Sequence, residues 1–149
     1  MKSVLACIDF TGMERSVIDA GAALARAFGG ELHLLHVAEP DPDFVGYRAG
    51  PETVRDRVAA TIRDEHRRVE ALAEEVSHGG LAAHAHLLRG PYAETILREA
   101  DRLGADVVVI GSHAHGRLHA LFVGSVAAQV LRGAKVPVLV VPPPPKPPS

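Results

Sequence analysis

The alternation of short apolar runs with longer segments of helical periodicity constrains the fold of this chain more than any other feature. The most strand-like run is DVVVI at Asp106–Ile110, a continuous β-branched stretch typical of a strand covered on both faces. Between such runs, apolar residues recur at spacings of three and four, which indicates helices that bury one face. Strands that alternate with helices in this way predict an α/β fold, with a parallel sheet joined by right-handed crossovers.

Five strands and four helices are expected from this pattern. The strands are predicted at 3–8, 31–37, 82–88, 106–110 and 136–141. The helices are predicted at 16–28, 54–76, 92–103 and 125–131. Pro137 lacks a backbone N–H, which places the last strand at an edge of the sheet. We therefore expect a five-stranded parallel sheet with helices on both faces.

The size and composition fit a single globular domain. The chain has 149 residues, of which 47% are hydrophobic and 23% charged, and we assign the domain to residues 1–141. Residues 142–149 include six prolines, so we expect a disordered Pro-rich tail there. A net charge of −2 and an aromatic content of 4% argue against nucleic acid as a partner. No apolar run reaches the roughly 18 residues that a membrane span needs.

The amino terminus and the cysteine content predict a cytoplasmic protein. The first residues lead directly into a short strand, unlike a signal peptide. Cys7 is the single cysteine, so no internal disulfide is expected, and we interpret it as a small buried hydrophobic residue rather than a nucleophile.

The loop after the fourth strand carries the strongest functional signal. Ligands of parallel α/β sheets bind beyond the carboxyl ends of the strands, where this loop opens at Gly111 and ends at Gly124-Ser125. Unpaired N–H groups at the start of the next helix, beside the Ser125 hydroxyl, can hold a phosphate. Arg117-Leu118 stands where a Walker loop requires Lys and Ser or Thr, so that motif is excluded. The first strand is followed by no Gly-x-Gly-x-x-Gly, which excludes a dinucleotide fingerprint.

Three segments give the chain a family resemblance. They are LLHVAEP after the second strand, GADVVVIGSHAHG around the fourth, and GSVAAQVLRGAKVPVLVV near the end. With Asp9 at the end of the first strand, they resemble the universal stress proteins over nearly the whole predicted domain. Nucleotide-binding members carry Gly, two residues, Gly, nine residues, then Gly with Ser or Thr. Here Gly111 and Gly124-Ser125 match that spacing, and Ala114 stands in place of the middle glycine.

The resemblance implies a Rossmann-like fold with strand order 3-2-1-4-5 and a site for ATP or another adenine nucleotide. A divalent cation such as Mg²⁺ is expected to accompany a triphosphate. By resemblance, Asp9 contacts adenine or ribose, and Val37 and Ala38 offer backbone groups to adenine. Ribose and phosphate contacts are implied for Ile110, Gly111, His113, Ala114, Gly124, Ser125 and Val126. A stress-response regulatory module is the implied role. A homodimer through the fifth strand is also implied, and its apolar edge is a physical reason to expect pairing.

The sequence also permits other interpretations of these residues. Asp9 is a common helix-capping residue, so it has a structural interpretation beside the binding one. Ala114 supports an alternative function, a dimeric interaction protein of the same fold that binds no nucleotide. An enzyme acting on nucleotides or adenylated substrates is a third hypothesis. No catalytic set is identified, and we expect at most slow ATP hydrolysis.

Two His-x-His pairs are candidate metal ligands, and three arginines are candidate anion-binding residues. His84 with His86, and His113 with His115, could bind zinc, but such sites usually need three or four convergent groups, so a structural role is favoured. Three arginines are expected to be solvated surface residues: Arg89, Arg117 and Arg132. Of these, Arg117 is the best candidate to bind an anionic ligand, because it lies within the loop after the fourth strand. Alternating charges over Arg55–Glu75, with Asp64 and Arg68 four residues apart, predict a solvated helix face.

Overall fold

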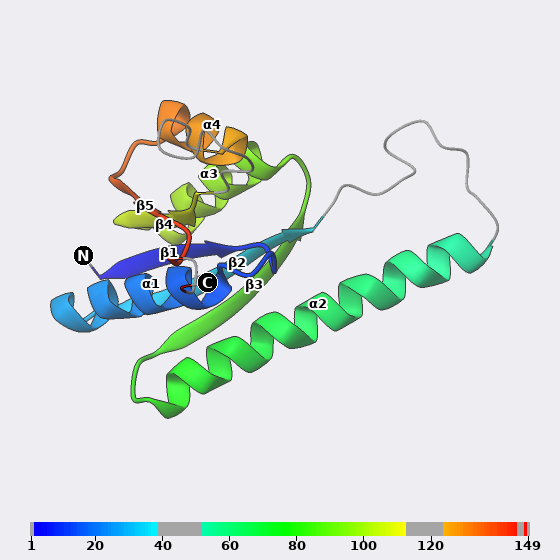
Figure 1. Ribbon diagram of the computed structural model, residues 1–149, viewed down its shortest axis with the longest axis horizontal. Helices are drawn as coiled ribbons and strands as arrows, with labels where there is room; N and C mark the ends of the chain where they lie inside the picture. Colours follow the sequence, from blue (N-terminus) through cyan, green and yellow to red (C-terminus); the bar gives the residue numbers. More distant parts are fainter. Residues whose placement is uncertain (1, 39–51, 113–123, 146–147, 149) are drawn as a thin grey trace.

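The computed structural model describes residues 2–38, 52–112, 124–145 and 148 (Figure 1). In α2 the side chains are described from residue 56 onward. The strands are β1 (Ser3–Ile8), β2 (Glu31–Ala38), β3 (Ala83–Arg89), β4 (Val107–Gly111) and β5 (Val138–Val141). The helices are α1 (Glu14–Phe28), α2 (Glu52–His78), α3 (Tyr92–Leu103) and α4 (Ser125–Gly133).

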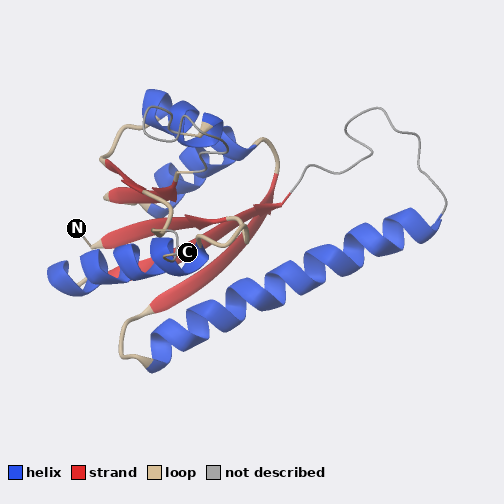
Figure 2. Cartoon of the chain, in the orientation of Figure 1, coloured by secondary structure: helices blue, strands red, loops and turns tan. Residues whose placement is uncertain are grey.

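The five strands form one parallel sheet in the order β3-β2-β1-β4-β5 (Figure 2). This confirms the fold class and the strand order expected from the sequence. The reversal of strand order on either side of β1 places a crevice at the carboxyl ends of β1, β2 and β4, which is where such sheets bind ligands.

Side chains of the strands alternate between two apolar cores. Val4, Ala6 and Ile8 of β1 pack with α1 and α2 on one face of the sheet. Leu5 of β1 packs with α3 and α4 on the other face, together with Leu35 of β2. In Figure 1, α3 and α4 accordingly lie above the sheet, and α1 and α2 below it. The β4 residues are buried throughout, as predicted for a strand covered on both sides.

All predicted boundaries are correct to within two residues, and two of the deviations have clear local causes. α1 begins at Glu14 rather than residue 16, because Met13 already accepts the first helical hydrogen bond, from the Val17 N–H. β5 begins at Val138 and forms the predicted edge of the sheet; the Pro137 carbonyl oxygen accepts a hydrogen bond from the Val108 N–H. The proline therefore contributes an acceptor where it cannot donate.

Asp106 lies just before β4 rather than within it. Its carboxylate oxygen Oδ2 accepts hydrogen bonds from the backbone N–H groups of Lys2 (2.7 Å) and Ser3 (3.0 Å). These two bonds lower the pKa of Asp106. The residue thus fastens the start of β1 to the start of β4.

α2 is longer than the part of the sheet that it covers, and its amino-terminal end extends past the carboxyl ends of the strands (Figures 1 and 2). Its carboxyl-terminal half is anchored by buried Val69 and Ala73. The guanidinium of Arg15 on α1 also donates two hydrogen bonds of 2.8 Å to the Glu75 carboxylate. Among the helices described, none has a stretch long and apolar enough to cross a membrane.

Candidate functional site

A cavity of about 840 Å³ opens at the carboxyl edge of the sheet. Its floor is formed by the ends of β1, β2 and β4, and its sides by α1, α2 and the amino-terminal ends of α3 and α4. A volume of this size lies in the range of small-molecule sites, about 300–1,000 Å³. The crevice expected from the strand order is therefore present as a cavity.

Eight of the ten site residues predicted from the sequence line this one cavity. They are Asp9, Val37, Ala38, Ile110, Gly111, Gly124, Ser125 and Val126. The other two, His113 and Ala114, lie outside the described residues, as does Arg117. The fold therefore brings together side chains that are separated by as many as 117 positions in the sequence, from Asp9 to Val126.

Asp9 lies at the mouth of the cavity, and its carboxylate stabilises the turn that follows β1. Its Oδ1 accepts hydrogen bonds from the Thr11 hydroxyl (2.7 Å) and the Thr11 N–H (3.2 Å). The amino-terminal cap of α1 is Met13, with no side-chain hydrogen bond, so the interpretation of Asp9 as a helix cap is wrong. The intervening Phe10 has a φ of 59°, a left-handed conformation that costs a residue with a side chain about 1–2 kcal/mol.

Gly111 ends β4 on the cavity floor, against α1. A β-carbon at this position would lie 3.1 Å from Met13 Cε and 3.4 Å from Val17 Cγ2. The missing side chain therefore lets α1 pack closely on the end of β4. This packing role adds to the close ligand approach predicted from the sequence.

The first turn of α4 presents unpaired backbone donors to the cavity. Gly124 caps the helix, and the first helical hydrogen bond runs from the Ala128 N–H to the Gly124 carbonyl oxygen. The N–H groups of residues 125–127 therefore lie before the first of these helical bonds. No acidic residue stands in this turn. The charge and geometry of this turn, with the exposed Ser125 hydroxyl beside it, are those that suit an anionic ligand.

One wall of the cavity was missed by sequence reasoning. It consists of α2 residues on a single helical face: Arg57, Val58, Thr61, Ile62 and Glu65. The alternating charges of this segment predicted a solvated helix face. The spacing of four between Val58 and Ile62 was the available signal, since it marks an apolar stripe on the same face.

Buried His36 links this α2 wall to the strands. Its Nδ1 lies 2.9 Å from the Ile8 carbonyl oxygen, and its Nε2 lies 3.1 Å from Glu65 Oε2. Because the carbonyl oxygen can only accept, Nδ1 carries a hydrogen, so a further proton must lie between Nε2 and the Glu65 carboxyl group. The Phe10 ring packs on the imidazole with centroids 4.8 Å apart.

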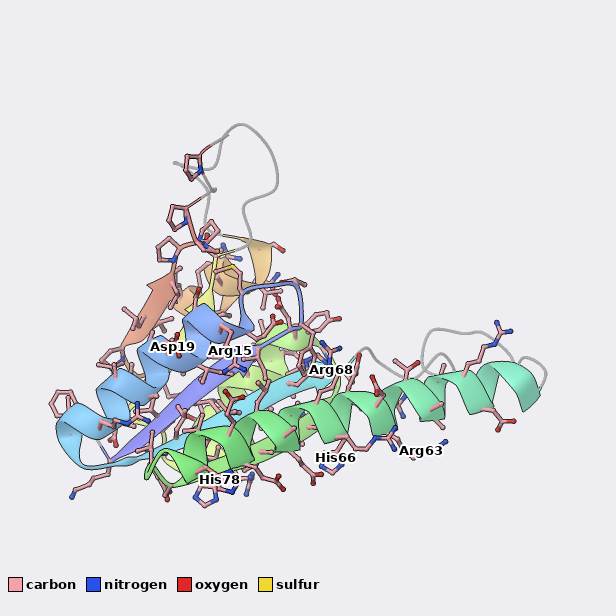
Figure 3. The ribbon with its side chains drawn as sticks, turned by 60° about the horizontal axis from the view of Figure 1, so that its bottom comes forward. Arg15, Asp19, Arg63, His66, Arg68 and His78 are labelled. Carbon is pink, nitrogen blue, oxygen red and sulfur yellow. The ribbon has the colours of Figure 1, made fainter. Side chains whose placement is uncertain are left out.

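Arg68 has a different partner from the one predicted. Asp64 pairs with Arg67 at 3.9 Å, whereas the Arg68 guanidinium lies 3.9 Å from the centroid of the Phe10 ring. Figure 3 shows Arg68 on the side of α2 that faces the sheet, opposite Arg63 and His66. The cation–π contact holds the turn after β1 against α2.

Cys7 lies on the cavity floor and is half-buried, rather than buried as predicted. Burial raises the pKa of its thiol to about 12, and the Asp9 carboxylate adds to the effect. The neutral thiol is therefore the form present at neutral pH, and it is a poor nucleophile.

His84 and His86 belong to a polar cluster outside the cavity. The Glu31 carboxylate lies 3.1 Å from both His33 Nε2 and His84 Nε2, and His33 Nδ1 lies 2.9 Å from His86 Nε2. The parallel register, which places His33 beside His84, assembles this cluster. Arg89 and Arg132 are exposed, as predicted.

Comparisons with known proteins agree with this architecture. A chain from Thermus aquaticus, a universal stress protein encoded in the QAH/OAS sulfhydrylase 3′ region, is 34% identical over 140 residues, covering 94% of this chain and 98% of its own length. A solved structure from the same family in Burkholderia pseudomallei is 26% identical, with a TM-score of 0.71 and coverage of 95% and 96%. The structure of an Archaeoglobus fulgidus universal stress protein in complex with dAMP is 22% identical, with a TM-score of 0.64 and coverage of 95% and 97%.

The family model makes the assignment for the chain as a whole. It carries the description "Universal stress protein family" and matches residues 1–142, which include every element of the sheet and every described residue of the cavity. The order of the strands, the position of the cavity and these similarities agree, and the chain belongs to the universal stress protein family.

Proposed function

We propose that this chain binds an adenine nucleotide in the cavity at the carboxyl edge of the sheet. The observation that carries the proposal is the convergence of the eight predicted site residues on a cavity of about 840 Å³. The dAMP complex of the Archaeoglobus protein supports it, because that chain shares this fold.

The phosphates are assigned to the first turn of α4. Gly124, Ser125 and Val126 offer backbone N–H groups and a hydroxyl, and His113 and Ala114 are proposed as further phosphate-side residues by resemblance. The ribose is assigned to the side of Ile110 and Gly111, and the base to the end of β2 at Val37 and Ala38, with Asp9 at the mouth between them. An anionic group thus meets the positive end of a helix dipole.

ATP with Mg²⁺ is the proposed form of the ligand. Asp9 and Glu14 are among the residues that line the cavity, and Mg²⁺ is usually bound by one or two carboxylates together with substrate phosphates. The role proposed for the bound state is regulation in a stress response. We place the protein in the cytoplasm, where its free Cys7 stays reduced.

A homodimer through β5 is proposed as the assembly. β5 is an edge strand, and its Leu139 side chain is 40% exposed. An uncovered apolar edge of this kind favours pairing with a second copy.

Calorimetry of ATP, ADP and AMP, with and without Mg²⁺, tests the nucleotide site. Gly124→Val is the informative variant, because the φ of −53° at this position is open to any residue and valine adds only a side chain at the phosphate end. Gln129→Val, an exposed position on the same helix, is the matched control. We expect binding by the wild type and the control, and its loss in Gly124→Val. If the wild type neither binds nucleotide nor releases any on denaturation, the interaction-protein alternative replaces this proposal.

A further inference from the structure

The α2 wall of the cavity differs in chemistry from the phosphate end. Val58 and Ile62 bring apolar side chains from α2, and Val37 and Ala38 bring apolar side chains from β2. Glu65 lies on the same helical face, one turn beyond Ile62. This end of the cavity thus combines apolar surfaces with a carboxylate at its edge. Such a combination suits a planar heterocyclic base, which has apolar faces and a polar edge.

The Glu65 carboxylate is held in a fixed position. Its side chain is 25% exposed, and Oε2 is bound to His36 Nε2, whose own ring is 7% exposed and anchored to the Ile8 carbonyl oxygen. The Phe10 ring packs against the imidazole, and Phe10 is held in turn by Arg68. Among the described residues, His36 provides the one hydrogen bond to Glu65. A carboxylate fixed in this way can recognise a ligand group by the direction of its hydrogen bond.

An ionised carboxylate accepts hydrogen bonds and cannot donate them. It therefore attracts an amino group on the edge of a base and repels a carbonyl oxygen in the same place. Adenine and hypoxanthine differ in this respect at C6, where adenine carries an amino group and hypoxanthine an oxygen. The proton between His36 and Glu65 stays with that pair, since it is already engaged by Nε2 and Oε2.

We infer that Glu65 is a specificity-determining residue, which accepts a hydrogen bond from the exocyclic amino group of the base and excludes 6-oxo purines. His36 is its positioning residue. The inference rests on the proposed binding of an adenine nucleotide and goes beyond it, since the residue comes from a helix to which the sequence assigned no role in the site.

Dissociation constants for ATP and inosine triphosphate test the inference, because these ligands share every phosphate and ribose contact. The wild type is expected to prefer ATP by about tenfold or more, the usual scale for a lost hydrogen bond to a charged group. In Glu65→Gln the amide can donate as well as accept, so the preference is expected to fall to within about threefold. Glu75→Gln is the matched control, on the same helix but outside the cavity, and it is expected to keep the wild-type preference.

The outcomes separate the two proposals. If the wild type binds ATP and Glu65→Gln keeps the full preference, the role of Glu65 is wrong and nucleotide binding stands. Equal affinity of the wild type for both ligands overturns the role of Glu65 in the same way. If the wild type binds neither ligand, the nucleotide site itself is wrong. Thermal unfolding of each variant checks that the fold is retained. His36→Gln removes the imidazole that positions Glu65, and it is expected to reduce the preference while ATP still binds.

Discussion

His33 Nδ1 on β2 and His86 Nε2 on β3 lie 2.9 Å apart, so the two imidazoles share one hydrogen. His33 Nε2 faces the Glu31 carboxylate, which can only accept, so this nitrogen carries the single N–H hydrogen of the His33 ring. His33 Nδ1 then accepts from His86. In this arrangement each imidazole carries one N–H hydrogen, and protonation of both rings would place two positive charges side by side.

Acid is expected to destabilise the protein through this cluster. Burial lowers the pKa of His86, and the neighbouring His33 lowers it further, against the raising effect of Glu99. Hydrogen bonds from His84 and His33 lower the pKa of Glu31, and that of Glu99 is lowered by Arg102. For all three groups the unfolded chain binds more protons than the folded one, so the free energy of unfolding falls as the pH falls. The loss of stability due to His86 begins as the pH falls below the ordinary pKa of histidine, near neutrality. The losses due to Glu31 and Glu99 follow at lower pH.

Urea unfolding from about pH 7 to about pH 5 measures the histidine part, since carboxylates titrate mainly below this window. His86→Gln removes the titrating ring and is expected to flatten the pH dependence. His66→Gln is the control, because His66 lies exposed on the outer side of α2 beside Glu70 (Figure 3). A His86→Gln slope equal to that of the wild type would show that His86 contributes nothing.

Cys7 is expected to react slowly in the folded protein. Its thiol pKa of about 12 leaves almost no thiolate at neutral or mildly alkaline pH, although the side chain lines the cavity. Iodoacetamide labelling followed by mass spectrometry should show little modification in buffer and rapid modification in denaturant. Cys7→Ser, which cannot be alkylated at this site, is the control for labelling elsewhere. Equal labelling rates in buffer and denaturant would contradict the assignment.

Gly111 is expected to tolerate no larger side chain without loss of stability. The β-carbon of alanine would lie 3.1 Å from Met13 Cε, so the thioether has to move, and a valine would add two further methyl groups there. We expect Gly111→Val to lower the free energy of unfolding by about 1–3 kcal/mol, the usual cost of overpacking. Met13→Ala should relieve part of this cost, so the double variant should be more stable than the two single losses predict. Additive losses in a urea-denaturation cycle would contradict the contact.

The sequence predicted well those features that depend on neighbouring residues. The β-branched run before Gly111 identified β4, and the glycine spacing to Gly124-Ser125 placed the start of α4 at the cavity. The polar cluster was missed because His33 and His86 come together only through the register of β2 and β3. The cavity wall at Glu65 was missed because its hydrogen-bond partner, His36, is 29 residues away on another element.

The placement of charged residues shows the same limit. Both Asp64 and Arg68 fit an ordinary surface pair at a spacing of four, yet Arg68 lies over Phe10. The left-handed turn at Phe10, which the sequence did not indicate, brings the ring under the guanidinium. Which partner a charged side chain takes is decided by the tertiary position of its helix, and spacing along the chain carries no information about that.

Leu139 is expected to determine assembly. It is the exposed apolar residue of β5, and an aspartate there would place charge against the edge that a second copy would pair with. Light scattering coupled to size exclusion is expected to find a dimer for the wild type and a monomer for Leu139→Asp. Phe28→Asp is the control, because Phe28 is likewise an exposed apolar residue, at 50%, but lies at the carboxyl end of α1 rather than on β5. A dimer that persists in Leu139→Asp but dissociates in Phe28→Asp would move the interface from β5 to the end of α1.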